Sequence, residues 1–216
     1  GNTVTLTVGI SVFLLIIFEL FLEPLCHLFG ATEGNLPYAL EYGSIIVLGF
    51  PFAMIDGAFG SIIRADGRPK VSMVGLLIGC ITNMILDPIF IFVCHWGVKG
   101  AAWATIIGQI LNAVYFAVCM LHFKTIAIKK QHMTPKWSVI KRILTLGTSS
   151  FISQAAAVFV IAVMNNSLAK YGALSKYGAD IPQAALGITM KVSPLITGIA
   201  LGIATGVQPS FGFNYG

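Results

Sequence analysis

The sequence predicts an all-α integral membrane protein, a polytopic bundle of transmembrane helices. Of the 216 residues, 56% are hydrophobic and only 10% are charged, whereas a water-soluble domain has about 25% charged residues. Because so few polar side chains cannot cover a globule in water, lipid must be the solvent for most of the chain. Apolar stretches of about 20 residues, long enough to span a bilayer as helices, recur along it. A run such as Ile10–Phe18 lacks the alternation of a membrane β-strand.

Six apolar stretches are long enough to cross a membrane. Polar breaks and turn-forming residues separate them. The predicted spans are Val4–Leu28, Tyr38–Ile63, Val71–Val93, Ala101–Phe123, Gly147–Ala169 and Ala185–Pro209. Within them, small residues spaced four apart predict close helix contacts at Gly75 and Gly79, and again at Gly198, Gly202 and Gly206.

The basic residues orient the spans, because short loops rich in Lys and Arg face the cytoplasm. Nine of the 13 basic residues lie in the second and fourth loops: Arg64, Arg68, Lys70, Lys124, Lys129, Lys130, Lys136, Lys141 and Arg142. These loops are therefore predicted to be cytoplasmic, and with six spans both ends of the chain face the cytoplasm too. The first and fifth loops, which contain Glu33 and Asp180, would lie outside.

The fourth loop is also the longest and most basic break, which favours a boundary between two helical bundles. We expect residues 1–123 to form most of one lobe, 124–146 a basic cytoplasmic interlobe loop, and 147–216 the first two helices of a second lobe. The chain begins with Gly1 rather than Met and shows no secretory signal pattern. We therefore expect it to be an internal piece of a longer protein.

The third predicted span carries two polar side chains that lipid would not tolerate without a reason. Asn83 and Asp87 are four residues apart, so they stack on one helix face about 6 Å apart along the axis. Pro88 cannot donate to the carbonyl of residue 84, which leaves an acceptor near the carboxylate. These hard oxygen atoms suit Na⁺, and the carboxylate suits a proton. The alternative is a packing hydrogen bond with a proline kink.

Four further polar side chains lie within the spans. Asp56, deep in the second span, either joins a cation site, or hydrogen-bonds a neighbouring helix, or lies at the cytoplasmic mouth near Arg64. Thr105 either returns its hydroxyl to its own helix or contributes an oxygen to the site of Asp87. Glu19 and Lys191 either line a cavity or extend to the membrane interface.

The sequence also disfavours several other classes of protein. A chain this apolar offers little polar surface to phosphates, so we expect no nucleic-acid partner. It contains no GxxxxGK[ST], HExxH or GxSxG pattern, so nothing indicates an ATPase, a metalloprotease or an esterase. We expect no enzymatic activity and no cofactor other than a bound Na⁺. The Cys26-His27 and Cys94-His95 pairs are poor zinc candidates, because no pattern brings them together.

The strongest local pattern runs from the second loop into the fourth span. It consists of IRADGRPK at 63–70, NMILDPIFIF at 83–92 and GVKGAAWAT at 97–105. In this order and spacing it resembles the MATE family of multidrug and toxic compound extrusion antiporters, especially the MepA-like bacterial branch. The ending, from GIATGVQP at 202–209 to NYG at 214–216, is similar to a helix of that family's second lobe.

The resemblance implies a two-lobe transporter of twelve helices, of which this chain supplies about helices 3–8. It also implies a cation site in the first lobe, built from an aspartate on helix one, an asparagine and an aspartate on helix five, and a threonine on helix six. Asn83, Asp87 and Thr105 match the last three positions. Asp56 lies near a position where many members have asparagine, which adds a carboxylate and leaves the coupling ion open.

These features predict a secondary active transporter, a Na⁺- or H⁺-coupled antiporter that exports drugs or organic cations across the bacterial cytoplasmic membrane. Its partners would be those small molecules, the coupling Na⁺ or H⁺ and the lipid bilayer, and we expect a monomer. The alternative is a lipid-linked saccharide flippase of similar two-lobe plan, which would need more basic residues inside the bundle than Lys191. A membrane-embedded structural subunit or enzyme is the third class.

Overall fold

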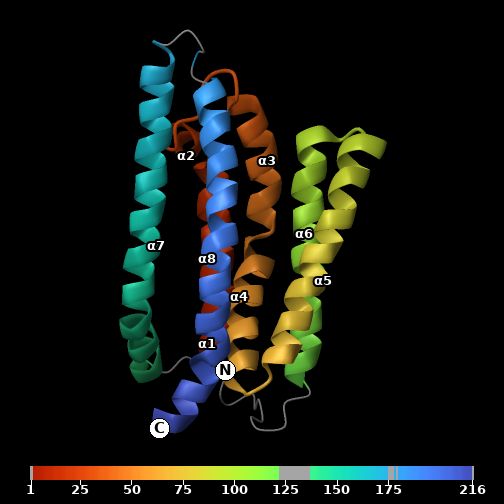
Figure 1. The fold of residues 1–216 in the computed structure, drawn as a ribbon, viewed down its shortest axis with the longest axis vertical. Helices are drawn as coiled ribbons and strands as arrows, with labels where there is room; N and C mark the ends of the chain where they lie inside the picture. The colour runs from red at the N-terminus through yellow and green to blue at the C-terminus, as the bar shows by residue number, and fades with distance from the viewer. Residues whose placement is uncertain (1, 122–136, 175–177, 179, 216) are drawn as a thin grey trace. The chain divides into compact units, whose positions relative to one another are not determined.

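The computed structural model describes residues 2–121, 137–174, 178 and 180–215 (Figure 1). Every regular element in these residues is helical, so the predicted all-α membrane fold is confirmed. The elements are α1 (Asn2–Leu20), α2 (Leu22–Leu28), α3 (Leu36–Leu48), α4 (Phe50–Ala65), α5 (Pro69–Pro88), the π-helix η1 (Ile89–Val93), α6 (Gly97–Leu121), α7 (Trp137–Gly172) and α8 (Asp180–Tyr215).

Five helical stretches in the described residues are long and apolar enough to cross a membrane, and the pair α3 and α4 makes a sixth candidate. This pair is bent by 52°. The bend lies at Gly49, with Pro51 in the first turn of α4, where the missing N–H of proline interrupts the helical hydrogen-bond ladder. The six predicted spans therefore all correspond to helices, and the second is broken at Gly49. The first, predicted as Val4–Leu28, is divided into α1, which ends at Leu20, and the short helix α2.

The start of α7 differs from the sequence prediction. The helix begins at Trp137, ten residues before the predicted span, so Lys141 and Arg142 lie on helix rather than in a loop. Apolar side chains at Ile140, Leu144 and neighbouring positions give these residues an amphipathic pattern that extends the helix past the apolar stretch. The rest of the predicted interlobe loop, at 124–136, lies outside the described residues.

The chain forms two compact units: residues 1–25 with 38–156, and residues 26–37 with 157–216. In unit 1, α4, α5 and α6 pack against one another, and α1 packs against α4. Phe59, Ile63, Phe116 and Met120 form its buried apolar cluster. The Phe116 ring is fully buried and lies directly over Gly75 of α5, where a Cβ atom would overlap it.

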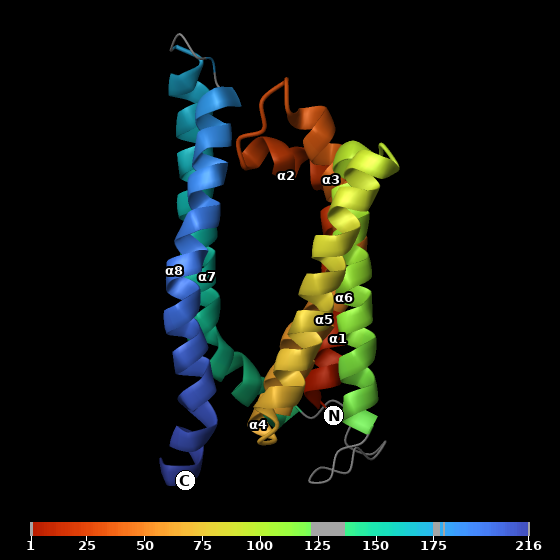
Figure 2. The ribbon, with the colours of Figure 1, turned by 45° about the vertical axis from the view of Figure 1, so that its right-hand side comes forward.

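Glycines set the distance between α5 and α6, which run alongside each other in Figures 1 and 2. A Cβ built on Gly79 would lie 3.2 Å from the carbonyl oxygen of Gly108, and one on Gly108 would lie 2.8 Å from that of Gly79. The predicted small-residue contact on α5 is thus confirmed. The one predicted at Gly198, Gly202 and Gly206 of α8 is not made within the described chain, since no atom lies within 4 Å of a Cβ there.

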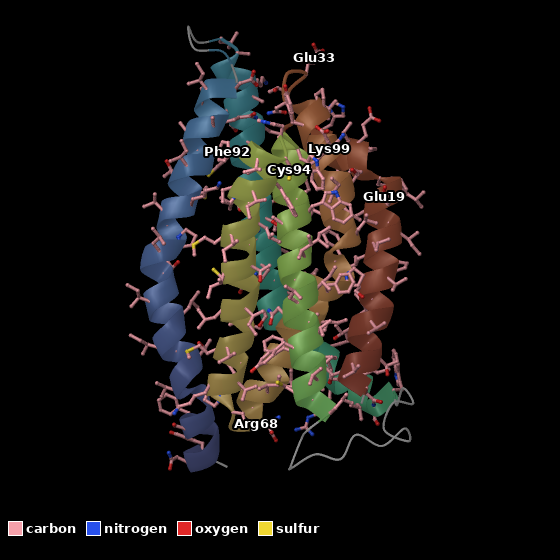
Figure 3. The ribbon with its side chains drawn as sticks, turned by 90° about the vertical axis from the view of Figure 1, so that its right-hand side faces the viewer. Glu19, Glu33, Arg68, Phe92, Cys94 and Lys99 are labelled. Atoms are coloured by element: carbon pink, nitrogen blue, oxygen red, sulfur yellow. The ribbon has the colours of Figure 1, made fainter. Side chains whose placement is uncertain are left out.

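Charged residues gather at the two ends of unit 1. Figure 3 shows Arg68 at one end of the helices and Lys99 at the other. Arg68 Nε lies 3.2 Å from Asp66 Oδ2, and Lys99 Nζ lies 2.7 Å from Glu41 Oε1. The ion pair between Lys99 and Glu41 joins the start of α6 to α3. Lys99, which lies outside the two basic loops of the sequence, therefore has a structural partner. Apolar side chains of α5 and η1 such as Met84 and Phe92 are exposed, as is typical of a lipid-facing surface.

Candidate functional site

Asn83 and Asp87 lie one turn apart on α5, as their spacing predicts. The Asn83 side chain donates from Nδ2 to Asp87 Oδ1 over 3.4 Å, a long hydrogen bond. Immediately after Asp87 the α-helix ends at Pro88, and the π-helix η1 takes over. Since a proline inside a helix disturbs the backbone ladder, this change of helix type places an irregular backbone next to the carboxylate, as is frequent at functional sites.

Thr105 of α6 completes a link between the two helices. Its hydroxyl donates to the Ala101 carbonyl over 2.9 Å and accepts from Asn83 Nδ2 over 3.2 Å. One hydroxyl thus serves both its own helix and the Asn83 amide. That Thr105 contributes an oxygen to a cation site stays a prediction. Asn83 bridges the carboxylate of α5 and the hydroxyl of α6. The structure thus brings together three of the four predicted site residues.

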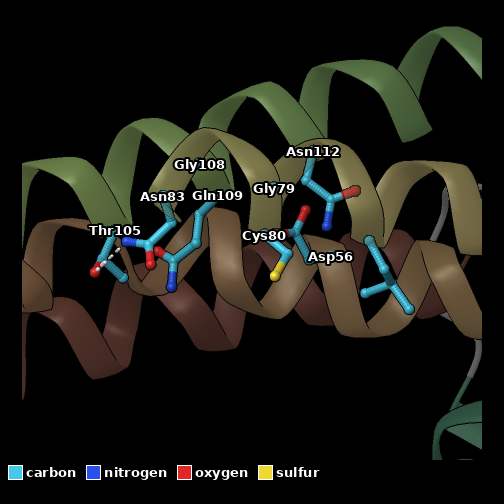
Figure 4. A pocket seen from close by; sticks show the side chains of 9 residues that line it. Asp56, Gly79, Cys80, Asn83, Thr105, Gly108, Gln109 and Asn112 are labelled. Atoms are coloured by element: carbon cyan, nitrogen blue, oxygen red, sulfur yellow. Dashed lines mark hydrogen bonds between the residues drawn. The ribbon is translucent and has the colours of Figure 1, made fainter. Parts of the chain in front are cut away.

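A cavity of about 230 Å³ opens between α4, α5 and α6 (Figure 4). It contains Asp56, the fourth predicted site residue, but Asp87 is not among its lining residues. The lining residues are Asp56, Leu76, Gly79, Cys80, Asn83, Thr105, Gly108, Gln109 and Asn112. The Asp56 carboxylate therefore shares a polar cavity with Asn83 and Thr105, while Asp87 lies one helical turn beyond Asn83.

Asp56 faces Asn112 of α6 in this cavity, as Figure 4 shows. Asn112 is only 4% exposed. One oxygen of each, Oδ1, is buried and has no hydrogen-bond partner among the described residues. Buried polar atoms normally have partners, and an unpartnered one is costly. This pair of oxygens is therefore a place where a proton or a cation would be stabilised.

Sequence reasoning missed Gln109 and Asn112. With Thr105 they occupy positions i, i+4 and i+7 of an otherwise apolar helix, a spacing that puts them on one face. That spacing was the signal that could have revealed them. A Cβ built on Gly49, at the bend between α3 and α4, would lie 2.6 Å from Gln109 Oε1. Gln109 thus reaches the broken part of the second span.

The other two polar candidates do not enter the cavity. Glu19 and Lys191 are exposed in the described chain, and neither lines the cavity. No group of three or more His, Cys, Asp or Glu side chains that could hold a metal occurs among the described residues. The side chains linked at Asp87 are one carboxylate, one amide and one hydroxyl. Such hard oxygens fit Na⁺ or a proton and do not fit zinc.

A membrane-embedded helical bundle with a carboxylate-containing polar cavity between its helices has the build of a transporter. The MatE family model matches residues 1–89. A multidrug export protein MepA of Staphylococcus saprophyticus is 28% identical over 211 residues, which cover 97% of this chain and 45% of the relative. That of Staphylococcus haemolyticus is 28% identical over 196 residues, 90% of this chain and 42% of the relative. The chain is therefore similar to proteins of the MATE family, which is the resemblance that its motifs predict.

Solved structures show the same fold. An inward-facing multidrug resistance MATE family transporter of the MOP superfamily superposes with a TM-score of 0.78 at 23% identity, over 97% of this chain and 51% of that one. A MOP superfamily transporter from Pyrococcus furiosus gives 0.75 at 24% identity, over 98% and 48%. This chain spans less than half the length of the curated relatives above.

Proposed function

We propose that the complete protein is a cation-coupled antiporter that exports drugs or organic cations across the bacterial cytoplasmic membrane, with Na⁺ or H⁺ as the coupling ion. The observation that carries the proposal is the link from Asp87 through Asn83 to Thr105 within the membrane-spanning helices. The names of the relatives support the drug substrates, because they are multidrug export proteins. We propose a monomer and no enzymatic activity.

The link between α5 and α6 gives this site a means of coupling. In the structure Asn83 turns its amide nitrogen toward both Asp87 and Thr105. A proton on the carboxylate, or Na⁺ held by its oxygens, weakens the acceptor that this nitrogen uses at Asp87. The two bonds are long, at 3.4 and 3.2 Å, so they exchange at low cost. Ion loading therefore changes how α5 is held to α6, which couples the ion to helix packing.

Asp56 gives the same cavity a second carboxylate. Its unpartnered oxygen next to Asn112 would be stabilised by a proton or a cation. We propose that Asp56 joins the cation-coupling set with Asp87, Asn83 and Thr105. The flippase alternative would need basic residues to hold a pyrophosphate, and none of the nine residues that line the cavity is basic.

Asp87→Asn in the protein expressed from its complete gene tests the proposal. Purified protein in proteoliposomes would be assayed for ethidium transport under a Na⁺ gradient and, separately, under a proton gradient. Coupling between two ligands typically amounts to about 5- to 150-fold in affinity, and we expect the variant to lose it. The matched control is Glu19→Gln, since Glu19 is an exposed carboxylate outside the cavity. Ion-dependent transport that survives Asp87→Asn would refute the mechanism.

A further inference from the structure

A network of hydrogen bonds joins the segment between α2 and α3 to α7 and α8, at the end where those two helices are connected. We call it the loop clasp: residues 28–35 together with Asn165, Asn166, Asp180 and Gln183. All of these residues belong to unit 2. Four bonds cross from the segment to the helices: Thr32 Oγ1 to Asp180 Oδ1 (2.7 Å), Asn35 Nδ2 to Gln183 Oε1 (3.0 Å), Gln183 Nε2 to the Gly30 carbonyl (2.8 Å) and Asn166 Nδ2 to the Leu28 carbonyl (2.7 Å).

Gln183 is the centre of the loop clasp. Its amide oxygen accepts from Asn35, and its amide nitrogen donates to Gly30 and, over 3.2 Å, to the Asn165 carbonyl. One side chain of α8 thus ties the segment to α7 as well as to α8. Asn35 in turn accepts from the backbone N–H of Thr32 over 2.8 Å, which fixes the shape of the segment.

The segment fits closely against α7 and α8 because it contains two glycines at the contacts. Gly30 is buried and has a φ of +87°, a conformation that favours glycine. A Cβ there would lie 3.0 Å from the backbone of Asn165 and Asn166. A Cβ on Gly34 would lie 3.1 Å from Asp180 Oδ2. Both glycines are thus needed for the close fit between the segment and the two helices, which indicates a specific contact.

The covalent path of the chain gives the loop clasp a mechanical role. On both sides the segment continues into helices of unit 1, through α2 to α1 and directly into α3. Any movement of α1 and α3 relative to α7 and α8 must break these bonds or pull the segment along. The cross-links are hydrogen bonds of modest individual strength, so they can hold one state of a two-state equilibrium and still open.

We propose that the loop clasp is a conformational lock that must open in each transport cycle. Its residues lie in the predicted first and fifth loops or at the ends of the spans next to them, which places it on the predicted outer face, so its closed form would hold the outer side shut. This inference rests on the proposed transport function. It adds a second device, built from other residues than the cation site, whose opening follows the movement that ion binding at Asp87 biases.

A disulfide across the loop clasp tests the lock. In the full-length protein with its native cysteines replaced by serine, Thr32→Cys and Asp180→Cys would be combined, because their side-chain oxygens are 2.7 Å apart. We expect mild oxidation to cross-link the pair and stop ethidium export, and a reductant to restore it. Each single cysteine variant is the control and should export normally after oxidation. A pair that does not cross-link, or that cross-links fully while export continues, overturns the proposal.

Weakening the clasp gives a second test that needs no transport. Gln183→Leu removes two cross-links at once, and we expect a cysteine placed at Ala31 to react about tenfold faster with a membrane-impermeant maleimide in intact cells. Thr189→Val is the matched control on α8, since its hydroxyl bonds only the Ala185 carbonyl of its own helix. Unchanged labelling in Gln183→Leu contradicts the lock. If the wild-type protein exports nothing, the proposed function fails, while labelling still reports the opening of the clasp.

Discussion

Helices α6 and α8 are both long and apolar, yet only α6 has buried residues in the described chain. Their mean hydropathies are close. Nine residues of α6 are buried, whereas no described side chain of α8 is buried. Apolarity therefore places both helices in lipid but does not decide which of them has neighbours, since lipid tails solvate an apolar side chain as well as a helix does.

The two helices differ in whether their small and polar residues contact a neighbouring helix. The glycines of α5 and α6 meet each other backbone to backbone at Gly79 and Gly108, and Asn83 hydrogen-bonds Thr105 across the same pair of helices. The glycines of α8 have the same spacing but meet no atom within 4 Å. Spacing alone thus permits close contact, and a facing helix is what makes it, so variants on the two helices should behave differently.

Gly75→Ala should show the largest effect, because it tests the packed helix pair. A Cβ there overlaps the ring of Phe116, which is fully buried. We expect a loss of about 1–3 kcal/mol in the free energy of unfolding, as overpacking typically costs. Thermal unfolding in detergent measures it.

The control for this variant is Gly57→Ala on α4, where a Cβ meets nothing within 4 Å. Its effect should stay within about 0.5 kcal/mol. Equal losses in both variants would show that the close approach of Phe116 to α5 does not contribute to stability.

Thr105→Val should have an intermediate effect, on ion binding rather than on folding. Thr105 and Thr189 each donate to a carbonyl four residues earlier in their own helix, Ala101 and Ala185. Only Thr105 also accepts from Asn83. We expect Thr105→Val to raise the coupling-ion concentration at half-saturation about two- to tenfold, the contribution of one hydrogen bond. Thr189→Val should leave that concentration unchanged. Transport measured against ion concentration decides, and matching curves for both variants would remove Thr105 from the site.

Gly202→Leu should have the smallest effect. Nothing in the described chain lies within 4 Å of a Cβ on Gly202, so we expect a change within about 0.5 kcal/mol in the unfolding free energy. A loss as large as that of Gly75→Ala in the full-length protein would show that α8 packs against helices other than those of residues 1–216. The comparison of α6 and α8 would then describe only this part of the molecule.

The predictable part of the site is local in the sequence. Asn83 and Asp87 fall on one helix face because of their four-residue spacing, and that bond is present. The pairing of Asn83 with Thr105 came from the family resemblance, and no spacing rule reaches across the 22 residues between them. Gln109 and Asn112 were missed because a neutral amide costs less free energy to place inside the membrane than a charged side chain does. Its presence in an apolar helix is therefore a weaker sign of function. Asp56 was found by its charge, but its partner Asn112 was not.

By itself, the sequence determined the membrane environment, the six spans and the side-chain pairs within one helix, because hydropathy and the 3.6-residue repeat act locally. Only the tertiary structure decided which polar groups meet between helices. In it Asn83 hydrogen-bonds Thr105, a cavity lies beside Asp56, and residues 28–35 hydrogen-bond Asn166 and Gln183. The physical reason is that contacts between helices depend on how closely two backbones approach, and that distance is set by residues far apart in the chain.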